Sequence, residues 1–392
     1  MSSIVHVWQG GYPWEVRVGK INRSLRMAGH DVTVVARKRK GELTQTVIDD
    51  IKIQRTVLAG PLSLPVPANP LWGSLIATTA REQNASLILV RDIPLALDAA
   101  KVARKLGLPI VMDMAEHYPE AMRSWDKYGV NPILRKLVHG WKLPDLLERK
   151  AVAAMDGIIV VCQEQKERLN REYGFADEKI CVAMNTPELE AWTSFRKGRI
   201  HERPKAFGYH GILCEDRELE VVLAGFEIAA AKDSEITLLL AGGGESEHKL
   251  RKLAGHLSAR DRITFTGRYA PEKLASLYSA VDYGIVSLRA NKFTEHTLAN
   301  KFFDYAALGK PFIFPAIKPL QSVMQNMNCG VEFNAGSAKS AAEAFLRIRE
   351  MNYDKLSHSG IKAVEHELNW AVDSKRLLSF LENYGVRVTK RS

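Results

Sequence analysis

The chain has 392 residues, of which 46% are hydrophobic and 26% charged, the balance of a globular protein of two or three domains. Lysine and arginine outnumber aspartate and glutamate by 55 to 45, and the net charge of +10 indicates an anionic partner such as a nucleotide diphosphate, a lipid phosphate or an acidic membrane face. Nucleic acid is not an expected partner, because the chain has no aromatic-basic array or motif of that class.

The first residues run directly into an apolar strand, with no charged-then-apolar leader, and no apolar run is long enough to span a bilayer. We therefore expect a cytoplasmic protein, either free or peripheral at the inner face of the cell membrane. The cysteines have no C-x-x-C spacing and indicate buried thiols in a reducing compartment: Cys162, Cys181, Cys214 and Cys329.

Apolar strands alternate with helical patterns through the first half. Residues 4–8 predict a strand, the loop 10–13 follows, and a helix is expected from about Glu15 to Ala28. Such apolar runs predict a parallel sheet buried on both faces. Further strands are expected at residues 32–36, 51–57, 87–90, 110–112 and 157–161.

The second half repeats this pattern from residue 206 onward, after a polar, basic linker at 185–204. We expect two doubly wound domains, 1–187 and 188–370, followed by a closing helical segment, 371–392. Ligands of such domains bind beyond the carboxyl ends of the strands. Strands of the second half are expected at residues 206–209, 236–241, 263–265, 283–286, 312–314 and 330–333.

Residues 295–311 predict a loop, a helix and a stop. Thr297 or Asn300 is expected to cap the helix, and Lys301 lies in the first turn, where free backbone N–H groups face an anion. Asp304, one turn deeper, is placed to accept hydrogen bonds from a sugar hydroxyl, and Gly309 suits a left-handed cap. The segment is either a seat for a nucleotide diphosphate or an ordinary capped helix.

The pattern Asn-Lys-x-Phe-Asp-Tyr-x-Ala-x-Gly-Lys-Pro from Asn300 resembles the donor-site helix of family 4 glycosyltransferases, in particular a subgroup with Asn-Lys before the aspartate. The resemblance implies an α/β GT-B fold, in which two Rossmann-like domains face each other across a cleft and a C-terminal helix crosses back to the first domain. It implies that Asp304 binds the nucleotide ribose. It also places a donor-binding stretch at His296, Thr297, Leu298, Ala299 and Asn300, with His296 where the family often has a glutamate.

The loop after the first strand of the second half resembles the family's diphosphate loop. The resemblance implies Gly211 near the donor and Arg217 on the diphosphate together with Lys301, while Ile212 stands where the family usually has another cation. On the residues alone, Arg217 could instead pair with Glu220 at a helix surface. The resemblance further implies that Gly243, in a glycine turn, and Arg268, after the next strand, contact the nucleotide; Arg268 could also be a surface charge.

The resemblance also covers the loop with Gly10 and Gly11, which could floor the cleft or form a plain tight turn, and Arg17, which could be a surface charge. Glu116 and His117 follow the strand at 110–112 and are expected near the acceptor. The family histidine aligns with the alanine two places earlier. Asp113 is expected to order the turn.

Trp125 to Lys150 mixes tryptophan, leucine and basic residues, which suits a leaflet surface or an exposed helix packed on the sheet. The proline-rich stretch Thr56–Ala80 could be an acceptor loop or a lipid-facing loop.

The resemblance implies a retaining, metal-independent glycosyltransferase without a resident cofactor, which moves a sugar from a nucleotide-diphosphate donor, UDP or GDP most readily, to a hydroxyl acceptor. The acceptor could be a polysaccharide, a small molecule or a lipid-linked glycan, and peripheral membrane contact is compatible with this. No metal-binding motif is present in the sequence. A nucleotide-sugar 2-epimerase and a non-catalytic partner subunit remain alternatives.

Overall fold

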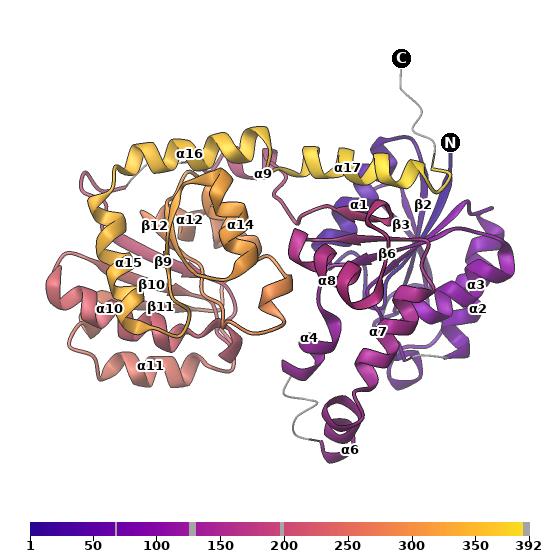
Figure 1. The fold of residues 1–392 in the computed structure, drawn as a ribbon, viewed down its shortest axis with the longest axis horizontal. Helices are drawn as coiled ribbons and strands as arrows, with labels where there is room; N and C mark the ends of the chain where they lie inside the picture. The colour runs from indigo at the N-terminus through magenta and orange to yellow at the C-terminus, as the bar shows by residue number, and fades with distance from the viewer. Residues whose placement is uncertain (67–68, 125–130, 197–199, 387–392) are drawn as a thin grey trace. The chain divides into compact units, whose positions relative to one another are not determined.

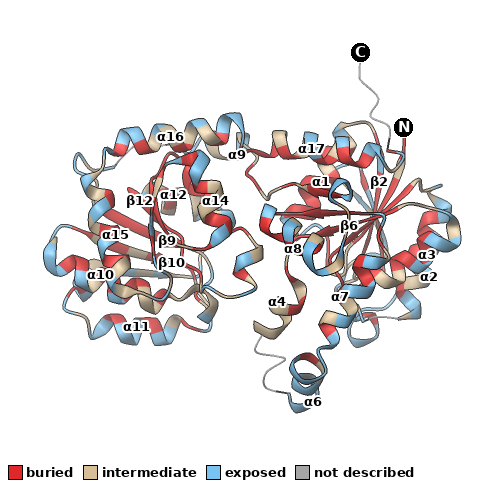
Figure 2. Ribbon diagram, viewed as in Figure 1, coloured by how far each residue is buried: buried red, intermediate tan, exposed pale blue. Residues whose placement is uncertain are grey.

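The computed structural model describes residues 1–66, 69–124, 131–196 and 200–386 (Figure 1). The chain forms two compact units: unit 1 comprises Met1–Asn185 and Asp373–Ser392, and unit 2 comprises Thr186–Val372. Each unit contains one sheet whose central strands are buried, whereas the edge strands β3 and β11 contain only exposed and half-buried residues (Figure 2).

Unit 1 has an eight-stranded sheet in the order β3-β4-β2-β1-β5-β6-β7-β8. All neighbours are parallel except β3 and β4, which form an antiparallel edge. The strand order reverses between β1 and β5, as in doubly wound folds. The strands are β1 (Ser3–Val7), β2 (Asp31–Ala36), β3 (Gln45–Ile48), β4 (Ile51–Arg55), β5 (Leu87–Arg91), β6 (Ile110–Met114), β7 (Gly157–Val160) and β8 (Ile180–Val182).

The helices of unit 1 connect these strands. Glu15 caps α1 by accepting a hydrogen bond from the backbone N–H of Val18, so the predicted helix start is confirmed to within one residue. The helices are α1 (Val16–Met27), α2 (Pro70–Glu82), α3 (Ala96–Leu106), α4 (Tyr118–Ser124), α6 (Pro132–Arg135), the π-helix η2 (Lys136–Gly140), α7 (Leu143–Ala153) and α8 (Gln163–Tyr173), with short 3-10 turns η1 (Pro61–Ser63) and η3 (Asp177–Lys179).

Unit 2 has a six-stranded, fully parallel sheet in the order β11-β10-β9-β12-β13-β14, which reverses between β9 and β12. The strands are β9 (Ala206–His210), β10 (Thr237–Ala241), β11 (Ile263–Gly267), β12 (Tyr283–Ile285), β13 (Phe312–Pro315) and β14 (Gly330–Phe333). The helices are α9 (Glu190–Thr193), α10 (Leu219–Lys232), α11 (Glu247–Gly255), α12 (Leu274–Ser279), α13 (Asn300–Ala307), α14 (Lys318–Met327), α15 (Ala338–Glu350) and α16 (Tyr353–His366), with 3-10 turns η4 (Glu215–Arg217), η5 (Arg260–Arg262), η6 (Pro271–Lys273) and η7 (Thr294–His296).

The last helix, α17 (Trp370–Glu382), carries the chain from unit 2 into unit 1. Tyr384 beyond it donates a hydrogen bond from its hydroxyl to the carbonyl of Asp156 at 3.2 Å. Gly157, at the start of β7, leaves room for this segment, because a Cβ there would lie 2.5 Å from the Tyr384 hydroxyl.

The sequence analysis missed two strands, β3 and β8. The expectation of a wholly parallel sheet in unit 1 is also wrong at one edge, where β3 and β4 are antiparallel. In β3 exposed and half-buried residues alternate, so it has no continuous apolar run. β8 has only three residues, Ile180–Val182. The other predicted strands are confirmed, with ends that differ by one or two residues.

Each unit has its own apolar core. In unit 1, Val5, Ile88 and Met112 of the sheet pack with Trp72 and Ile76 of α2. In unit 2, residues such as Phe207 and Leu238 of the sheet pack with Phe226 of α10 and Phe345 of α15. Complete burial of each such side chain contributes about 1.5–3 kcal/mol to folding.

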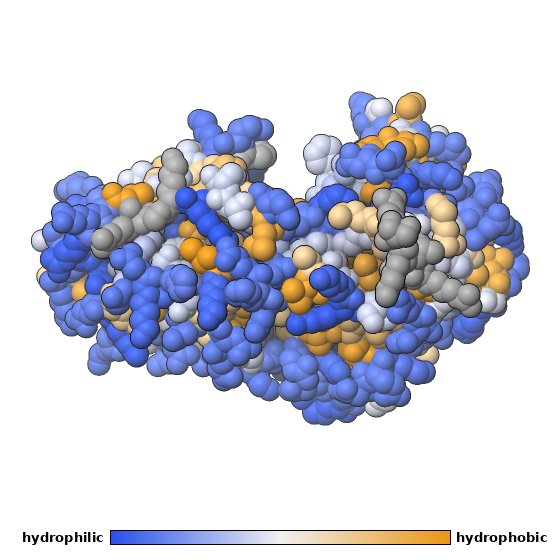
Figure 3. All heavy atoms as spheres, turned by 90° about the horizontal axis from the view of Figure 1, so that it is seen from above, coloured by the Kyte–Doolittle hydropathy of each residue, from blue (hydrophilic) through white to orange (hydrophobic). Residues whose placement is uncertain are grey.

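The surface is mainly hydrophilic on the face drawn in Figure 3, with small hydrophobic areas between charged side chains. Among the described residues, no helix has both the length and the apolar composition needed to cross a membrane.

Candidate functional site

The candidate site of unit 2 lies where its strand order reverses, between β9 and β12. Ligands of doubly wound sheets bind at this point, beyond the carboxyl ends of the strands. The hydroxyl of Ser287, just after β12, donates a hydrogen bond to the carbonyl of Arg217, in the loop that follows β9. The two loops at the reversal are therefore tied together.

Helix α13 follows β12 and begins at the same edge of the sheet. Lys301 Nζ donates to Asp304 Oδ2 at 3.0 Å. Asp304 is only 8% exposed, whereas the side chain of Lys301 is 32% exposed. The two residues that the resemblance assigns to the ribose and the diphosphate therefore pair with each other here, one side chain being buried and the other partly exposed.

The predicted cap of this helix is wrong. Ala299 occupies the N-cap position, Asn300 is the first helical residue, and Thr297 is the extended residue that closes η7. Since alanine has no side-chain acceptor, it leaves the backbone N–H groups of the first turn to other partners. Gly309, just beyond the helix, has φ +67°, as its predicted role requires.

An aromatic cluster holds Asp304 in place. The hydroxyl of Tyr278, on α12, donates to Asp304 Oδ2 at 3.2 Å, and its ring lies 4.3 Å from that of His210 and 5.5 Å from that of Tyr305. Burial, and after it the charge of Asp304, raises the pKa of Tyr278 well above its ordinary value. The hydroxyl therefore stays protonated and donates to the carboxylate.

His210, the last residue of β9, is neutral. Burial lowers its pKa to about 3. Its Nδ1 lies 2.9 Å from the hydroxyl of Tyr305, which in turn lies 2.8 Å from the carbonyl of Gly208. Because that carbonyl can only accept, Tyr305 donates to it, and we assign the histidine proton to Nδ1. Gly284 makes room for this arrangement, since a Cβ there would lie 2.4 Å from the Tyr305 ring.

Arg217 lies half-buried on η4. The alternative that it pairs with Glu220 is wrong: within the described residues, Glu220 forms an ion pair with Lys249 at 2.7 Å and none with Arg217. The charge of Arg217 opposes the rise in pKa that burial causes in Tyr209 and Cys214, so its guanidinium lies close to both residues.

The glycines of this edge pack against each other. A Cβ on Gly242 would lie 1.7 Å from the carbonyl oxygen of Gly211, and one on Gly244 would lie 2.2 Å from that of Leu213. A Cβ on Gly243 would lie 2.4 Å from the side chain of Arg268. Close contact between the two loops thus accounts for the glycine turn, before any ligand is considered.

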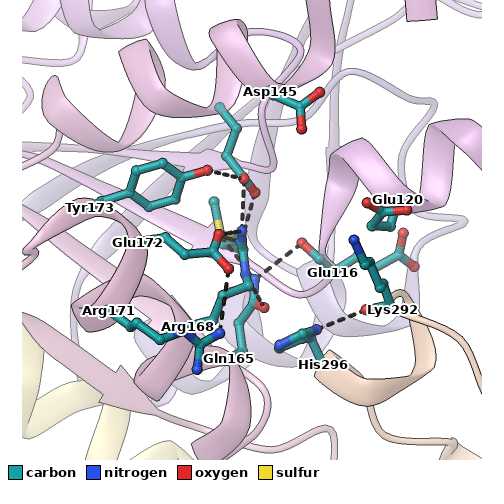
Figure 4. Close-up of polar contacts among 12 residues, drawn as sticks. Glu116, Glu120, Asp145, Gln165, Arg168, Arg171, Glu172, Tyr173, Lys292 and His296 are labelled. Carbon is teal, nitrogen blue, oxygen red and sulfur yellow. Dashed lines mark hydrogen bonds and ion pairs between the residues drawn. The ribbon is translucent and has the colours of Figure 1, made fainter. Parts of the chain in front are cut away.

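The remaining predicted donor residues lie around this loop. Arg268 is exposed after β11, and Leu298 is buried. His296 closes η7, where its Nδ1 lies 2.8 Å from the carbonyl of Lys292 (Figure 4).

In unit 1, Gly10 and Gly11 follow β1 at the strand-order reversal. A Cβ on Gly10 would lie 2.6 Å from the ring of Trp8, and one on Gly11 would lie 2.6 Å from Arg39 Nε. The indole N–H of Trp8 donates to the carbonyl of Gly11 at 3.1 Å. These contacts explain the glycines as a tightly packed turn, which is one of the two interpretations left open by the sequence.

Nearby, the alternative given for Arg17 and the expectation for Asp113 are both wrong. Arg17 is not a surface charge: it is 1% exposed, and its guanidinium donates to Asp113 at 2.8 and 3.0 Å. Asp113 does not order a turn, because it lies inside β6 with no exposed surface. Burial would raise its pKa, but Arg17 and Arg91 outweigh that effect and hold the pKa below its ordinary value. Asp113 is therefore a buried carboxylate between two arginines.

Glu116 and His117 follow β6, as predicted, with Glu116 half-buried and His117 8% exposed. The amide of Gln165, on α8, reaches the Glu116 carbonyl at 3.5 Å (Figure 4). The same helix carries the fully buried Arg168, which binds both oxygens of Glu148 on α7 at 2.8 Å. A buried ion pair thus joins α7 to the helix that supports the Glu116 loop.

Four polar residues at the two strand edges were missed: Arg91, Asp92, His210 and Tyr278. Arg91 and Asp92 directly follow the apolar run of β5, and His210 ends β9. Their position at the carboxyl end of a strand could have indicated a ligand-binding edge. Tyr278 is in an ordinary amphipathic helix and gave none.

The segment from α6 to α7 exposes large apolar side chains. Ile133 is 72%, Trp141 67% and Leu146 48% exposed. Cationic side chains share this surface, and Lys136 Nζ lies 5.3 Å from the ring of Trp141. The predicted Trp125 and Lys127 lie outside the described residues. We call this the α6–α7 surface; its exposed cations are Arg135, Lys136, Lys142, Arg149 and Lys150.

Each half of the chain matches a family model. Residues 15–189 match Glycosyltransferase Family 4, and residues 204–350 match Glycosyl transferases group 1. An uncharacterized glycosyltransferase of Bacillus subtilis (strain 168) is 26% identical over 189 residues, 47% of each chain. D-inositol 3-phosphate glycosyltransferase of Rhodococcus jostii (strain RHA1) is 23% identical over 261 residues, 61% of this chain and 56% of that protein. The chain thus spans about half the length of these curated relatives.

Solved structures share the fold over nearly the whole chain. Sucrose-phosphate synthase from Thermosynechococcus elongatus has a TM-score of 0.75 at 17% identity, covering 98% of this chain and 99% of that one. HepE of Anabaena, in complex with UDP and glucose, has a TM-score of 0.69 at 12% identity, covering 98% and 100%. The catalytic domain of starch synthase IV from Arabidopsis thaliana has a TM-score of 0.71 at 11% identity, again covering 98% and 100%.

The two family models account for most of the chain, one in each Rossmann-like unit, and the solved relatives share the architecture of both units. The chain belongs to the family 4, group 1 glycosyltransferases of GT-B fold.

Proposed function

We propose that this protein is a retaining, metal-independent glycosyltransferase that moves a sugar from a nucleotide-diphosphate donor to a hydroxyl acceptor. The observation that carries the proposal is the Lys301–Asp304 pair in the first turns of α13, at the strand-order reversal of unit 2. A carboxylate held by a buried tyrosine next to a half-exposed cation suits a ribose joined to a diphosphate.

In this proposal Asp304 accepts hydrogen bonds from the ribose hydroxyls. Lys301 leaves Asp304 and binds the diphosphate, together with Arg217. Lys301 is free enough to do so, because a third of its side chain is exposed and its ion pair with Asp304 is partly screened by solvent. Donor binding thereby replaces Lys301 as a partner of Asp304 without leaving the Asp304 carboxylate buried and unpaired.

The leaving diphosphate gains negative charge as the glycosidic bond breaks. Arg217, Lys301 and the backbone N–H groups at the start of α13 would stabilise this charge in place of a metal ion. Preorganised donors of this kind commonly lower the barrier by about 3 kcal/mol each. Retention would follow from displacement on the same face of the sugar, in which the departing phosphate helps to deprotonate the acceptor.

UDP is the nucleotide to test first. Structural relatives were solved with UDP and with UDP-glucose, and the backbone-lined glycine loops at this edge suit a nucleotide. GDP sugars are the second choice.

The donor site is tested by UDP titration calorimetry on wild type, Asp304→Ala and Arg217→Ala. Each variant should weaken UDP binding by tenfold or more, since each loses a hydrogen bond to a charged group worth about 1.5–3 kcal/mol. Asp261→Ala is the matched control, because the Asp261 side chain is 91% exposed on η5. Full UDP affinity in both site variants would refute the site.

The reaction is tested by NMR of the product anomer, with and without EDTA. Retained configuration and unchanged transfer in EDTA are expected; an inverted product or loss of activity in EDTA would refute the mechanism. Sugar-nucleotide interconversion without any acceptor would instead identify an epimerase.

We further propose that the acceptor binds unit 1 near Gly11, Glu116 and His117, and that the α6–α7 surface lets the protein reach lipid-linked acceptors at the inner face of the membrane. Basic side chains around exposed Trp141 and Ile133 suit an anionic leaflet.

Vesicle sedimentation tests this contact. Binding to vesicles with phosphatidylglycerol, and not to pure phosphatidylcholine, should be lost in the double variant Ile133→Ala, Trp141→Ala. Leu253→Ala, which removes a 40% exposed apolar side chain of unit 2, should bind like wild type. Equal vesicle binding by wild type and all variants would exclude the α6–α7 surface as the membrane contact.

A further inference from the structure

Unit 1 has a carboxylate at its own strand-order reversal that the proposed donor site does not use. Asp92 directly follows β5, the strand next to β1. Its φ is +56°, a left-handed conformation that few residues other than glycine adopt. Residues held in such conformations cluster at functional sites, because the surrounding structure must compensate for the strain. Asp92 is also 5% exposed, so an ionisable group is held almost out of water.

One oxygen of Asp92 is occupied and the other is available. Oδ1 accepts the backbone N–H of Ala115 at 3.2 Å. Within the described part of the chain, Oδ2 forms an ion pair with Arg91 Nε at 3.5 Å, which is longer than a good charge-assisted hydrogen bond. Oδ2 therefore keeps lone pairs for a donor from outside the protein.

The surroundings of Asp92 carry net negative charge. Arg91 also faces Asp113 at 3.2 Å and Glu15 at 3.6 Å, while Arg17 is engaged by Asp113. Burial raises the pKa of Asp92; Arg91 opposes this rise, and Glu116 and Asp113 add to it. His6, also nearby, is neutral because burial lowers its pKa to about 4. Three carboxylates around Asp92 (Glu15, Asp113, Glu116) face two arginines, which leaves an excess of one negative charge before Asp92 itself is counted; this excess attracts hydrogen-bond donors and repels phosphates.

We propose that Asp92 Oδ2 accepts a hydrogen bond from a ring hydroxyl of the acceptor, and that this ring is an uncharged sugar or polyol rather than a sugar phosphate. The inference rests on the proposed function, because it assigns unit 1 to the acceptor. Asp92 is a binding residue in this proposal, and no bond to it forms or breaks.

The role of Asp92 can be tested with one variant and a matched control. Asp92→Asn keeps the oxygen that bonds Ala115 and tolerates the left-handed backbone, but places an NH₂ donor where Oδ2 accepts. Asp50→Asn is the matched control: Asp50 has φ +58°, and it is exposed in the β3–β4 turn.

Saturation-transfer NMR with UDP present would compare glucose, galactose, mannose and myo-inositol with their monophosphates. At least one parent compound should bind wild type and Asp50→Asn alike, bind more tightly than its phosphate, and bind Asp92→Asn about tenfold or more weakly. Unchanged binding by Asp92→Asn, preference for a phosphate, or no binding of any parent compound would overturn the inference. UDP calorimetry on the same samples reports separately on the donor site.

The pH dependence adds an independent readout. Wild-type affinity for the bound sugar should fall as the pH drops through the raised pKa of Asp92, because the protonated carboxyl loses its charge. The affinity of Asp92→Asn should stay flat over that range. A parallel fall in both proteins would assign the effect to Glu116 or Glu15 and overturn the role of Asp92.

Discussion

The two units share a doubly wound topology, but their sheets are supported at the ligand-binding edge by different chemistry. In unit 1, Asp113 is buried between Arg17 and Arg91. In unit 2, Asp304 is held by the hydroxyl of Tyr278 and by a partly exposed lysine. A carboxylate enclosed by buried arginines cannot change partner without leaving charges unpaired, whereas one held by a neutral hydroxyl and a partly exposed cation can. The comparison separates a structural aspartate from one that can bind a ligand.

The largest loss of stability is expected for Asp113→Asn. It leaves two buried arginines without their shared partner and should lower the free energy of unfolding by about 3–5 kcal/mol. Urea unfolding measures the loss. Asp31→Asn is the control: Asp31 pairs with Arg26 at 2.8 Å with 51% of its side chain exposed and should cost at most about 1 kcal/mol. Equal losses in both would mean that the buried cluster is not structural.

Acid should destabilise both units through one histidine each. Burial lowers the pKa of His6 to about 4 and that of His210 to about 3, from an ordinary value of 6.5. Below pH 6.5 the unfolded chain binds a proton that the folded chain does not, so stability falls as the pH drops; for His6 the loss reaches about 3 kcal/mol near pH 4.

Unfolding of His6→Gln and His210→Gln across pH 7 to 4 measures these contributions, and each should be less steep than wild type. His248→Gln, at an exposed position on α11, should follow the wild-type curve. An unchanged slope in both buried variants would show that other groups dominate.

Gly242→Ala tests the contact between the glycine loops of unit 2. The new Cβ would lie 1.7 Å from the Gly211 carbonyl oxygen, at a φ of +145°. We expect a loss of about 1–3 kcal/mol in unfolding free energy and weaker UDP binding. Gly255→Ala, at the end of α11 with no atom within 4 Å of the added Cβ, should be neutral or stabilising by up to about 1 kcal/mol.

The smallest loss of stability is expected at Tyr278, which holds Asp304. Tyr278→Phe removes the hydrogen bond to Asp304 and should cost about 1 kcal/mol in stability and roughly threefold to tenfold in UDP affinity. Tyr353→Phe removes another buried tyrosine bond of unit 2, to the Asp282 carbonyl at 3.1 Å. It should cost similar stability and leave UDP affinity unchanged. If both variants lose affinity equally, Tyr278 does not position Asp304.

Much of the fold was predictable because buried parallel strands are continuous apolar runs. The exceptions were β3, a half-exposed edge strand, and β8, which is only three residues long. The start of α13 was correct to within a residue or so, but its cap was not, because a polar residue near a helix start need not occupy the N-cap.

The candidate site was predictable in part. Arg217 lies in the loop after β9, and Lys301 and Asp304 lie on α13. Each belongs to a short motif of neighbouring residues, so the resemblance could name them. It could not show that Lys301 and Asp304 pair with each other, nor that Arg17, 96 residues from Asp113 along the chain, forms its buried partner.

The order of residues by itself determined the alternation of strands and helices, the two similar halves and the group of polar residues near α13, because periodicity and local motifs are properties of neighbouring positions. Only the tertiary structure decided which charges are buried and with which partners. Burial and pairing depend on strands that meet across the sheet, and the energy of a charge changes several-fold with its distance from water and from the opposite charge. That is why Asp92, Asp113 and Asp304 are the same residue type in sequence and three different groups in the folded protein.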